Sequence, residues 1–139
     1  MSEFDLSEER RARVFEVFKT VPYARHLGLE LVGLGPGEAT VKLAVRDEFR
    51  QLYGLLHGGA TASLIDTATA MAIIGAFGED EPTTTIDLNV QYLRPAVEGE
   101  IFCTAKIIRA GKRIIFLSAE VIDDQNRIVA TALSTYTKV

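Results

Sequence analysis

The stretch from Gln51 to Gly78 carries a single formal charge, that of Asp66. Residues 57–77 are apolar or small on nearly every side, so a helix formed by them needs cover over most of its surface. A carboxylate in such surroundings is costly unless it is ion-paired, hydrogen-bonded or protonated. The chain must therefore wrap other structure around this helix, and Asp66 is the first candidate for a chemical role.

A membrane-spanning helix is the competing interpretation of Gly59–Phe77, which has about the length that a bilayer requires. The segment holds Asp66 and several hydroxyl residues, and no Lys or Arg lies close to either end. Many of its residues are alanines, which suit close packing against a sheet. We therefore expect the core helix of a water-soluble protein, with no membrane partner.

The composition limits the functions that the chain can have. A net charge of −4, from 15 basic and 19 acidic residues, disfavours nucleic acid as the main partner, although a local basic cluster can still bind a small anion. His26, His57 and Cys103 have no metal-ligand spacing, so we expect neither a metal nor another cofactor. Met1–Arg13 lacks the apolar region of a signal peptide, which predicts a cytoplasmic protein.

The apolar pattern predicts the order of the elements. A helix is expected over residues 7–20, where Ser7 can cap a first turn that contains two glutamates; Pro22 then stops the pattern. A second helix is expected over residues 57–77. Strands are predicted over residues 29–34, 38–45, 83–93, 100–109, 112–123 and 127–137.

The connections between these strands are too short for parallel crossovers, so the sheet is predicted to be antiparallel. A curved sheet wrapped around the central helix covers most of the helix, and a second copy of the chain can bury the remaining face. The sequence therefore predicts one α+β domain over residues 1–139, with an extra N-terminal helix, that forms a homodimer.

Three segments carry a family resemblance. Residues Gln51–Asp66, with His57-Gly58-Gly59 at a fixed spacing before Asp66, resemble the signature of hotdog-fold acyl-CoA thioesterases of the phenylacetate-degradation (PaaI-like) type. The resemblance extends through Thr83–Ala96 and resumes at Arg109–Arg113. It implies a hotdog fold and the hydrolysis of an acyl-CoA thioester by water, without a metal or redox cofactor.

In this family the amide at the position of Gly58 polarises the thioester carbonyl and acts as an oxyanion hole. Gly58 and Gly59 begin the central helix, so we expect both N–H groups to be unpaired at the positive end of the helix dipole, with Gly59 beside the substrate. The structural alternative is that the two glycines only allow a tight turn from loop to helix.

The resemblance makes Asp66 the nucleophile or the general base. As a nucleophile it forms a mixed anhydride with the acyl group, and as a base it activates water; the sequence leaves both routes open. The structural alternative is a buried aspartate hydrogen-bonded to Ser63 or Thr69, which lie three residues away on the same helix face.

The helix spacing also bears on assembly. His57 and Asp66 are nine residues apart, about 13.5 Å along a helix and on opposite sides of it, so they cannot both reach one carbonyl from the same chain. Two antiparallel helices related by a two-fold axis would bring Gly58 of one subunit to Asp66 of the other. The family is similar in placing its sites at a dimer interface, and we expect a dimer or a dimer of dimers.

Further site residues follow from the resemblance. Gln51 matches a position where the family carries Asn or Gln to orient the substrate carbonyl or the attacking water, although a solvated loop glutamine is the alternative. His57 either holds the loop or donates a hydrogen bond to the thioester oxygen. Thr84 or Thr85 matches a Ser or Thr near the reacting group, and the strand register decides which of them faces the site.

Coenzyme A is polyanionic, so an acidic protein needs a local basic edge to bind it. Arg109, Lys112 and Arg113 gather around Gly111 at a predicted hairpin, and Arg94 lies at another strand end. Cations at strand ends can bind phosphates in a surface groove. The alternative is that these are ordinary solvated charges in turns.

The acyl pocket is the least determined part of the site. Tyr53, Leu55 and Leu56 precede the central helix and are candidate lining residues, and Phe15 and Phe18 of the N-terminal helix are candidates to close one side. Aromatic acyl groups such as phenylacetyl or hydroxylated benzoyl follow from the resemblance alone, and medium-chain acyl groups stay open.

Two other functions were weighed against thioester hydrolysis. A hotdog dehydratase or hydratase pairs a catalytic His with an Asp or Glu in a different arrangement, which this chain lacks. A non-catalytic acyl-CoA-binding module is opposed by the presence of Asp66 and by the absence of a DNA-binding extension.

Overall fold

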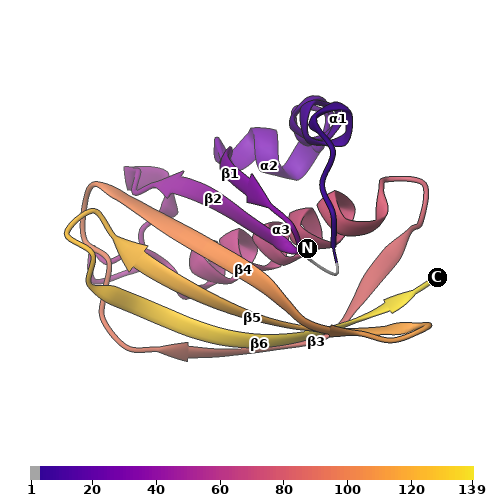
Figure 1. Cartoon of the computed structure of the whole chain (residues 1–139). Helices are drawn as coiled ribbons and strands as arrows, with labels where there is room; N and C mark the ends of the chain where they lie inside the picture. The colour runs from indigo at the N-terminus through magenta and orange to yellow at the C-terminus, as the bar shows by residue number, and fades with distance from the viewer. Residues whose placement is uncertain (1–3) are drawn as a thin grey trace.

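One long helix lies against the concave face of a curved antiparallel sheet in the computed structural model, which describes residues 4–139 (Figure 1). The helix is α3, Gly58–Phe77, and the sheet has six strands in the order β1-β2-β4-β5-β6-β3. Their bounds are β1 Glu30–Gly35, β2 Glu38–Ala44, β3 Thr83–Tyr92, β4 Glu100–Ala110, β5 Ile114–Asp123 and β6 Ile128–Lys138. The prediction of an α+β fold with an antiparallel sheet around a central helix is confirmed.

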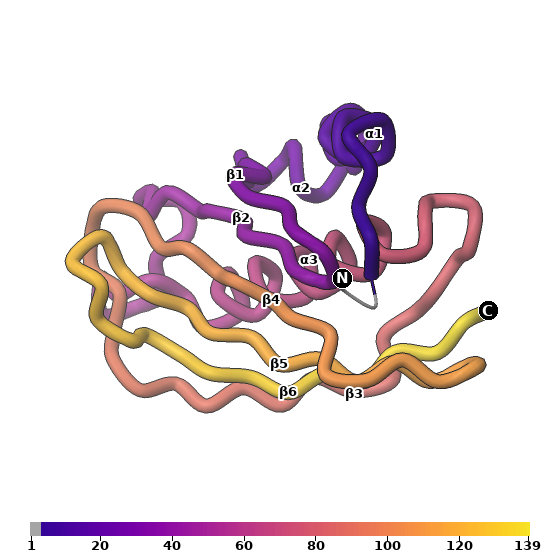
Figure 2. The backbone as a smooth tube through the Cα atoms, in the orientation of Figure 1, coloured from indigo at the N-terminus to yellow at the C-terminus, as the bar shows by residue number. Residues whose placement is uncertain are grey.

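The sheet curves around α3 because alternate residues of its strands are apolar and point at the helix. Figure 2 shows β1 and β2 passing on one side of α3 and β3 and β6 on the other. Fully buried side chains from both layers meet in one core: Val41, Leu43, Ile101, Ile115, Leu117, Leu64, Ile65 and Met71. Cys103 lies within this core, where burial raises the pKa of its thiol to about 12, so the thiol stays protonated and unreactive.

The N-terminal region differs from its prediction. The helix expected over residues 7–20 is α1, Glu8–Phe18, and a further short helix, α2, covers Pro22–Leu27. Pro22 begins α2 instead of only stopping the first helix, because a proline at the first helical position loses no intrahelical hydrogen bond. Gly28 ends α2 in the left-handed conformation, with φ of 69°.

Helix α1 packs against the C-terminal end of α3. Val14 and Phe18 bury the inner face of α1, and Arg10 Nη1 donates a hydrogen bond to the Ala76 carbonyl oxygen at 3.1 Å. Arg13 forms an ion pair of 3.0 Å with Glu79 in the turn after α3. These contacts place α1 at the C-terminal end of α3 and leave the N-terminal end of α3 to other segments.

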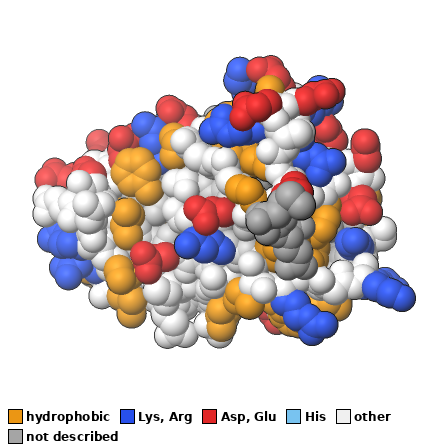
Figure 3. All heavy atoms as spheres, viewed as in Figure 1, with side chains coloured by type: hydrophobic (Ala, Val, Ile, Leu, Met, Phe, Trp, Pro, Cys, Tyr) orange, Lys and Arg blue, Asp and Glu red, His pale blue; other side chains and the backbone are white. Residues whose placement is uncertain are grey.

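Two surfaces of the sheet expose apolar side chains. Strand β3 is an edge strand that pairs only with β6, and it exposes about half of Ile86 and Tyr92. The convex face exposes Ile108, Phe116 and Leu133. On the face shown in Figure 3, by contrast, acidic and basic side chains are interspersed.

Candidate active site

The N-terminus of α3 presents one free backbone donor. His57 is the N-cap residue, and its Nδ1 accepts a hydrogen bond of 2.8 Å from the Gly59 N–H. Within residues 4–139, no group accepts a hydrogen bond from the Gly58 N–H. The Gly58 amide is therefore an unpaired donor at the positive end of the helix dipole, as an oxyanion hole requires.

The expectation that the Gly59 N–H is unpaired was wrong. This N–H is not free, because the imidazole of His57 occupies it. This geometry also makes Nδ1 of His57 an acceptor, so the role of His57 that the structure displays is to hold the start of the helix. Its Nε2 is left for any contact with a ligand.

A side chain at either glycine would be crowded. A Cβ at Gly58 would lie 3.3 Å from the ring of Tyr92, and a Cβ at Gly59 would lie 2.9 Å from Nδ1 of His57. The Tyr92 hydroxyl donates a hydrogen bond of 2.6 Å to the Gly58 carbonyl oxygen. Tyr92 of β3 therefore crowds Gly58, and the imidazole that caps the helix crowds Gly59.

Asp66 lies in the middle of α3 with its two carboxylate oxygens in different surroundings. Oδ1 accepts hydrogen bonds from Thr85 Oγ1 at 2.8 Å and from the Tyr136 hydroxyl at 3.1 Å. Oδ2 accepts no hydrogen bond from residues 4–139, and it is not buried. One oxygen is therefore held in place and the other is open to a reacting group.

The structural alternative, in which the Asp66 carboxylate forms hydrogen bonds with Ser63 or Thr69 of the same helix, named the wrong partners. Ser63 donates a hydrogen bond to the Gly59 carbonyl oxygen, and Thr69 Oγ1 lies within 2.9 Å of the Asp66 carbonyl oxygen. Neither hydroxyl contacts the Asp66 carboxylate, because both bond to carbonyls of the preceding helical turn.

The strand register separates the two candidate threonines. Thr85 pairs with Tyr136 across the β3–β6 ladder, and both side chains point at α3. Thr84 pairs with Thr137, so its side chain lies on the other face of the sheet, away from Asp66. Thr85 is therefore the threonine that reaches the carboxylate.

Tyr136 is the functional residue that sequence reasoning missed. It is 3% exposed, and its hydroxyl contacts both Asp66 and Thr69. Burial raises the pKa of Tyr136 well above its ordinary value, which keeps the phenol protonated as a donor. The available signal was an aromatic residue with a hydroxyl at an inward position of the last strand, since a buried tyrosine hydroxyl needs a partner.

The loop before α3 forms one wall of a groove of about 350 Å³ at Gly58. Gln51 Oε1 accepts hydrogen bonds from the N–H groups of Tyr53 and Leu55, so this oxygen shapes the loop. Gln51 Nε2 has no acceptor among the described residues and can donate to a ligand. The lining residues of the groove are Gln51, Leu55, Leu56, Gly58, Thr61, Tyr92, Leu93, Arg94, Pro95, Ala96 and Val129.

The other predicted lining residues lie outside this groove. Tyr53 is 81% exposed at the tip of the loop. Phe15 and Phe18 line a separate groove of about 390 Å³ between α1, α2 and β1, beside Lys19 and Arg25. Within one chain the N-terminal helix therefore does not close the groove at Gly58.

The candidate phosphate-binding cations lie at two places. Arg109, Gly111, Lys112 and Arg113 form the β4–β5 hairpin, at the end of the sheet where β3 begins. Arg94 follows β3 at the opposite end and lines the groove at Gly58. Across residues 4–139, no acidic side chain pairs with these arginines or with Lys112.

The two reactive groups do not meet within one chain. Gly58 and Asp66 are eight residues apart on the same helix, about 12 Å along its axis. The free donor lies beside Tyr92, whereas the carboxylate lies beside Thr85 and Tyr136.

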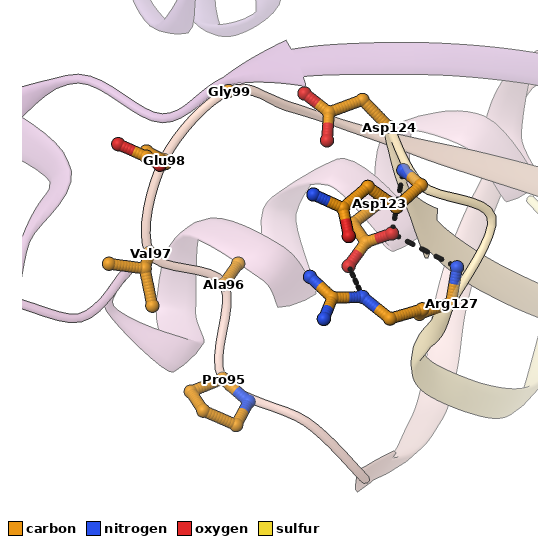
Figure 4. A pocket seen from close by; sticks show the side chains of 9 residues that line it. Pro95, Ala96, Val97, Glu98, Gly99, Asp123, Asp124 and Arg127 are labelled. Atoms are coloured by element: carbon orange, nitrogen blue, oxygen red, sulfur yellow. Dashed lines mark hydrogen bonds and ion pairs between the residues drawn. The ribbon is translucent and has the colours of Figure 1, made fainter.

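A second hollow, of about 340 Å³, lies between residues 95–99 and the β5–β6 turn (Figure 4). Asp123 accepts hydrogen bonds from the backbone N–H groups of Arg127 at 3.0 Å and Gln125 at 2.9 Å, and from Arg127 Nε at 2.8 Å. These donors, the Arg127 N–H above all, lower the pKa of Asp123. The Asp123 carboxylate is therefore engaged in fixing the turn. No cluster of three metal-ligating side chains occurs anywhere in residues 4–139.

Known proteins are similar to this chain over the segment that holds the site. The model of the thioesterase superfamily matches residues 53–130, which include the N-terminus of α3, Asp66 and Thr85. The chain is 35% identical to human acyl-coenzyme A thioesterase 13 over 111 residues, 76% of this chain and 79% of that protein. It is 30% identical to the medium/long-chain acyl-CoA thioesterase YigI of Salmonella typhimurium over 133 residues, with 84% of each protein covered.

Solved structures share the fold. The PaaI protein of the E. coli phenylacetic acid degradation operon superposes with a TM-score of 0.88 over 97% of this chain and 96% of that chain, at 23% identity. The central helix wrapped by the curved sheet is thus the hotdog arrangement.

The N-cap role of His57 can be tested through stability. His57→Ala removes the acceptor of the Gly59 N–H and should lower the free energy of unfolding by about 0.5–2 kcal/mol. His57→Asn keeps a side-chain acceptor and should retain most of the stability. Urea unfolding of the three proteins measures the difference, and equal stability of His57→Ala and wild type would contradict the role.

Proposed function

Because this chain belongs to the thioesterase superfamily, we propose that it hydrolyses acyl-CoA thioesters to a free acid and CoA. The observation that carries the proposal is the free Gly58 N–H on the same helix as an Asp66 carboxylate whose Oδ2 is open. An oxyanion donor and a carboxylate are the two groups that thioester hydrolysis requires. The names of two relatives, acyl-coenzyme A thioesterase 13 and medium/long-chain acyl-CoA thioesterase, support CoA esters as the substrate class.

The chemistry can follow either of two routes. In the first, Asp66 Oδ2 attacks the thioester carbonyl carbon, the C–S bond breaks, and the CoA thiolate takes a proton from water. Water then cleaves the mixed anhydride and regenerates Asp66. In the second, Asp66 removes a proton from a water molecule while that water attacks the carbonyl carbon, and CoA leaves as before. The Gly58 N–H stabilises the oxyanion in both routes.

The complete site is proposed to form between two subunits. The separation of about 12 Å between Gly58 and Asp66 on one helix is too large for one carbonyl group. Strand β3 offers an unpaired edge beside both groups, and its exposed apolar side chains Ile86 and Tyr92 favour burial. A two-fold axis at this edge would bring Gly58 of one subunit to Asp66 of its partner.

The same arrangement would join the two groups of cations. In one chain Arg94 and the β4–β5 hairpin with Lys112 lie at opposite ends of β3. With two antiparallel subunits, Arg94 of one lies toward the hairpin of the other, and this edge can bind the phosphates of CoA. The exposed apolar residues on the convex face, Ile108, Phe116 and Leu133, support a further pairing into a dimer of dimers.

The Asp66 role is tested by thiol release from aromatic and aliphatic acyl-CoA esters. Asp66→Asn keeps the size of the side chain but removes its charge, so release should fall by about 100-fold or more. Asp80→Asn, in the exposed turn after α3, is the matched control and should retain wild-type rates. If folded wild-type protein releases thiol from none of the esters, hydrolysis is overturned and the acyl-CoA-binding module takes its place.

The shared site is tested by mixing Asp66→Ala with Gly58→Pro, two variants that each lack one half. After complete exchange, half of the dimers are mixed and each mixed dimer holds one intact site, so about a quarter of the wild-type activity should return. Each variant mixed with itself is the control. If both halves came from one chain, exchange that is verified with tagged subunits would restore no activity.

The basic hairpin is tested with Lys112→Ala. Loss of a phosphate contact should raise KM for the CoA ester more than it lowers kcat, and Lys106→Ala on the same strand pair is the control. The corresponding N-acetylcysteamine thioester has no phosphates, so its kinetics should not respond to Lys112→Ala. An equal effect on both substrates, or a fall in kcat alone, would contradict phosphate binding.

A further inference from the structure

Two hydroxyl groups contact the Asp66 carboxylate from one side, and a third lies behind them. Thr85 and Tyr136 are direct partners in the β3–β6 ladder, so their side chains stand next to each other on the concave face of the sheet. Asp66 of α3 lies over this pair. Thr69, one turn further along α3, brings its hydroxyl to 2.8 Å from that of Tyr136.

A count of protons shows which group donates to the carboxylate. The Tyr136 hydroxyl has one proton and three oxygens in reach: the Asp66 carbonyl oxygen at 2.9 Å, Asp66 Oδ1 at 3.1 Å and Thr69 Oγ1 at 2.8 Å. Thr69 has its own acceptors in the carbonyl oxygens of Ile65 and Asp66. An ionised carboxylate is the strongest of these acceptors, so the Tyr136 proton points at Oδ1 when Asp66 is charged.

The result is an asymmetric carboxylate. Oδ1 receives the Thr85 and Tyr136 hydrogen bonds, whereas Oδ2 receives none from residues 4–139. We propose that Tyr136 is a positioning residue that, together with Thr85, fixes the Asp66 side chain so that Oδ2 faces the reaction. The effect on the reaction rests on the proposed thioester hydrolysis, but the donation to Asp66 does not.

Burial prevents water from replacing the Tyr136 hydroxyl as a donor to Asp66. Tyr136 is 3% exposed and Thr69 is fully buried, so water does not compete for the phenol proton. The raised pKa of Tyr136 keeps that proton on the phenol through the neutral and mildly alkaline range. A hydrogen bond to a charged group in such a site is stronger than one between neutral groups.

Within residues 4–139, no cation pairs with the Asp66 carboxylate. Among the described residues of α3, Asp66 is the only charged side chain. On the neighbouring strands, Asp87 shares the convex face with Thr135 and Phe116, and Lys138 pairs with Glu81. The orientation of Asp66 therefore depends on the two hydroxyl donors and not on an ion pair.

The test substitutes Tyr136→Phe, which keeps the ring in the core and removes only the hydroxyl. The ¹³Cγ resonance of Asp66, recorded by NMR at one neutral pH, should move from its wild-type position, because Oδ1 has lost a donor. In thiol-release assays kcat should fall by about tenfold or more with little change in KM.

Two matched proteins accompany this variant. Tyr23→Phe removes a more exposed hydroxyl that bonds to Ser63, and it should leave both the Asp66 resonance and the kinetics unchanged. Replacement of Tyr136 by 3-fluorotyrosine keeps the shape and makes the phenol a stronger donor, so the Asp66 resonance should move in the opposite direction. This second variant also carries the test if Tyr136→Phe fails to fold.

The outcomes separate this inference from the proposed function. An Asp66 resonance that does not move in folded Tyr136→Phe, or that moves in the same direction in both Tyr136 variants, overturns the inference. A resonance that moves as stated while wild type cleaves no ester upholds the donation by Tyr136 and overturns thioester hydrolysis.

Discussion

The rest of the structure depends on one constraint: the sheet has to shield the apolar surface of α3 from water. A helix with apolar residues on nearly all sides is stable in water only if other elements surround it. The strands meet this requirement by curving, and α1 closes the far end of the helix through Arg10 and Arg13. The only charged side chain of α3, Asp66, then has to find its partners within the surrounding structure.

The same helix divides the chemistry between two places. Its N-terminus supplies a backbone donor, because the first N–H groups of a helix have no intrahelical acceptor, and His57 occupies one of these groups but leaves that of Gly58. Its middle supplies the carboxylate. A rigid helix keeps these two groups about 12 Å apart, and the proposal that a second subunit completes the site rests on this distance.

Much of this arrangement was predictable from the sequence. The central helix and the six strands follow from local periodicity, and the antiparallel sheet follows from the short connections between strands. The groups at Gly58 and Asp66 follow from residue type and spacing. The helix at Pro22–Leu27 was missed. A proline can end one helix or begin the next, and only the path of the chain after the proline shows which of these it does. For the partners of Asp66, the structural alternative named only Ser63 and Thr69 of the same helix, because contacts between distant strands cannot be deduced from spacing along one helix.

The sequence by itself determined which segments form helices and strands, because the periods of 3.6 and 2 residues are local properties. It also determined that one carboxylate would lie in an apolar segment after a glycine turn. The tertiary structure decided which hydroxyls reach that carboxylate: Thr85 and not Thr84, and Tyr136 from a strand seventy residues away. Strand register and the crossing point of α3 over the β3–β6 pair set these contacts, and both depend on how the whole core packs.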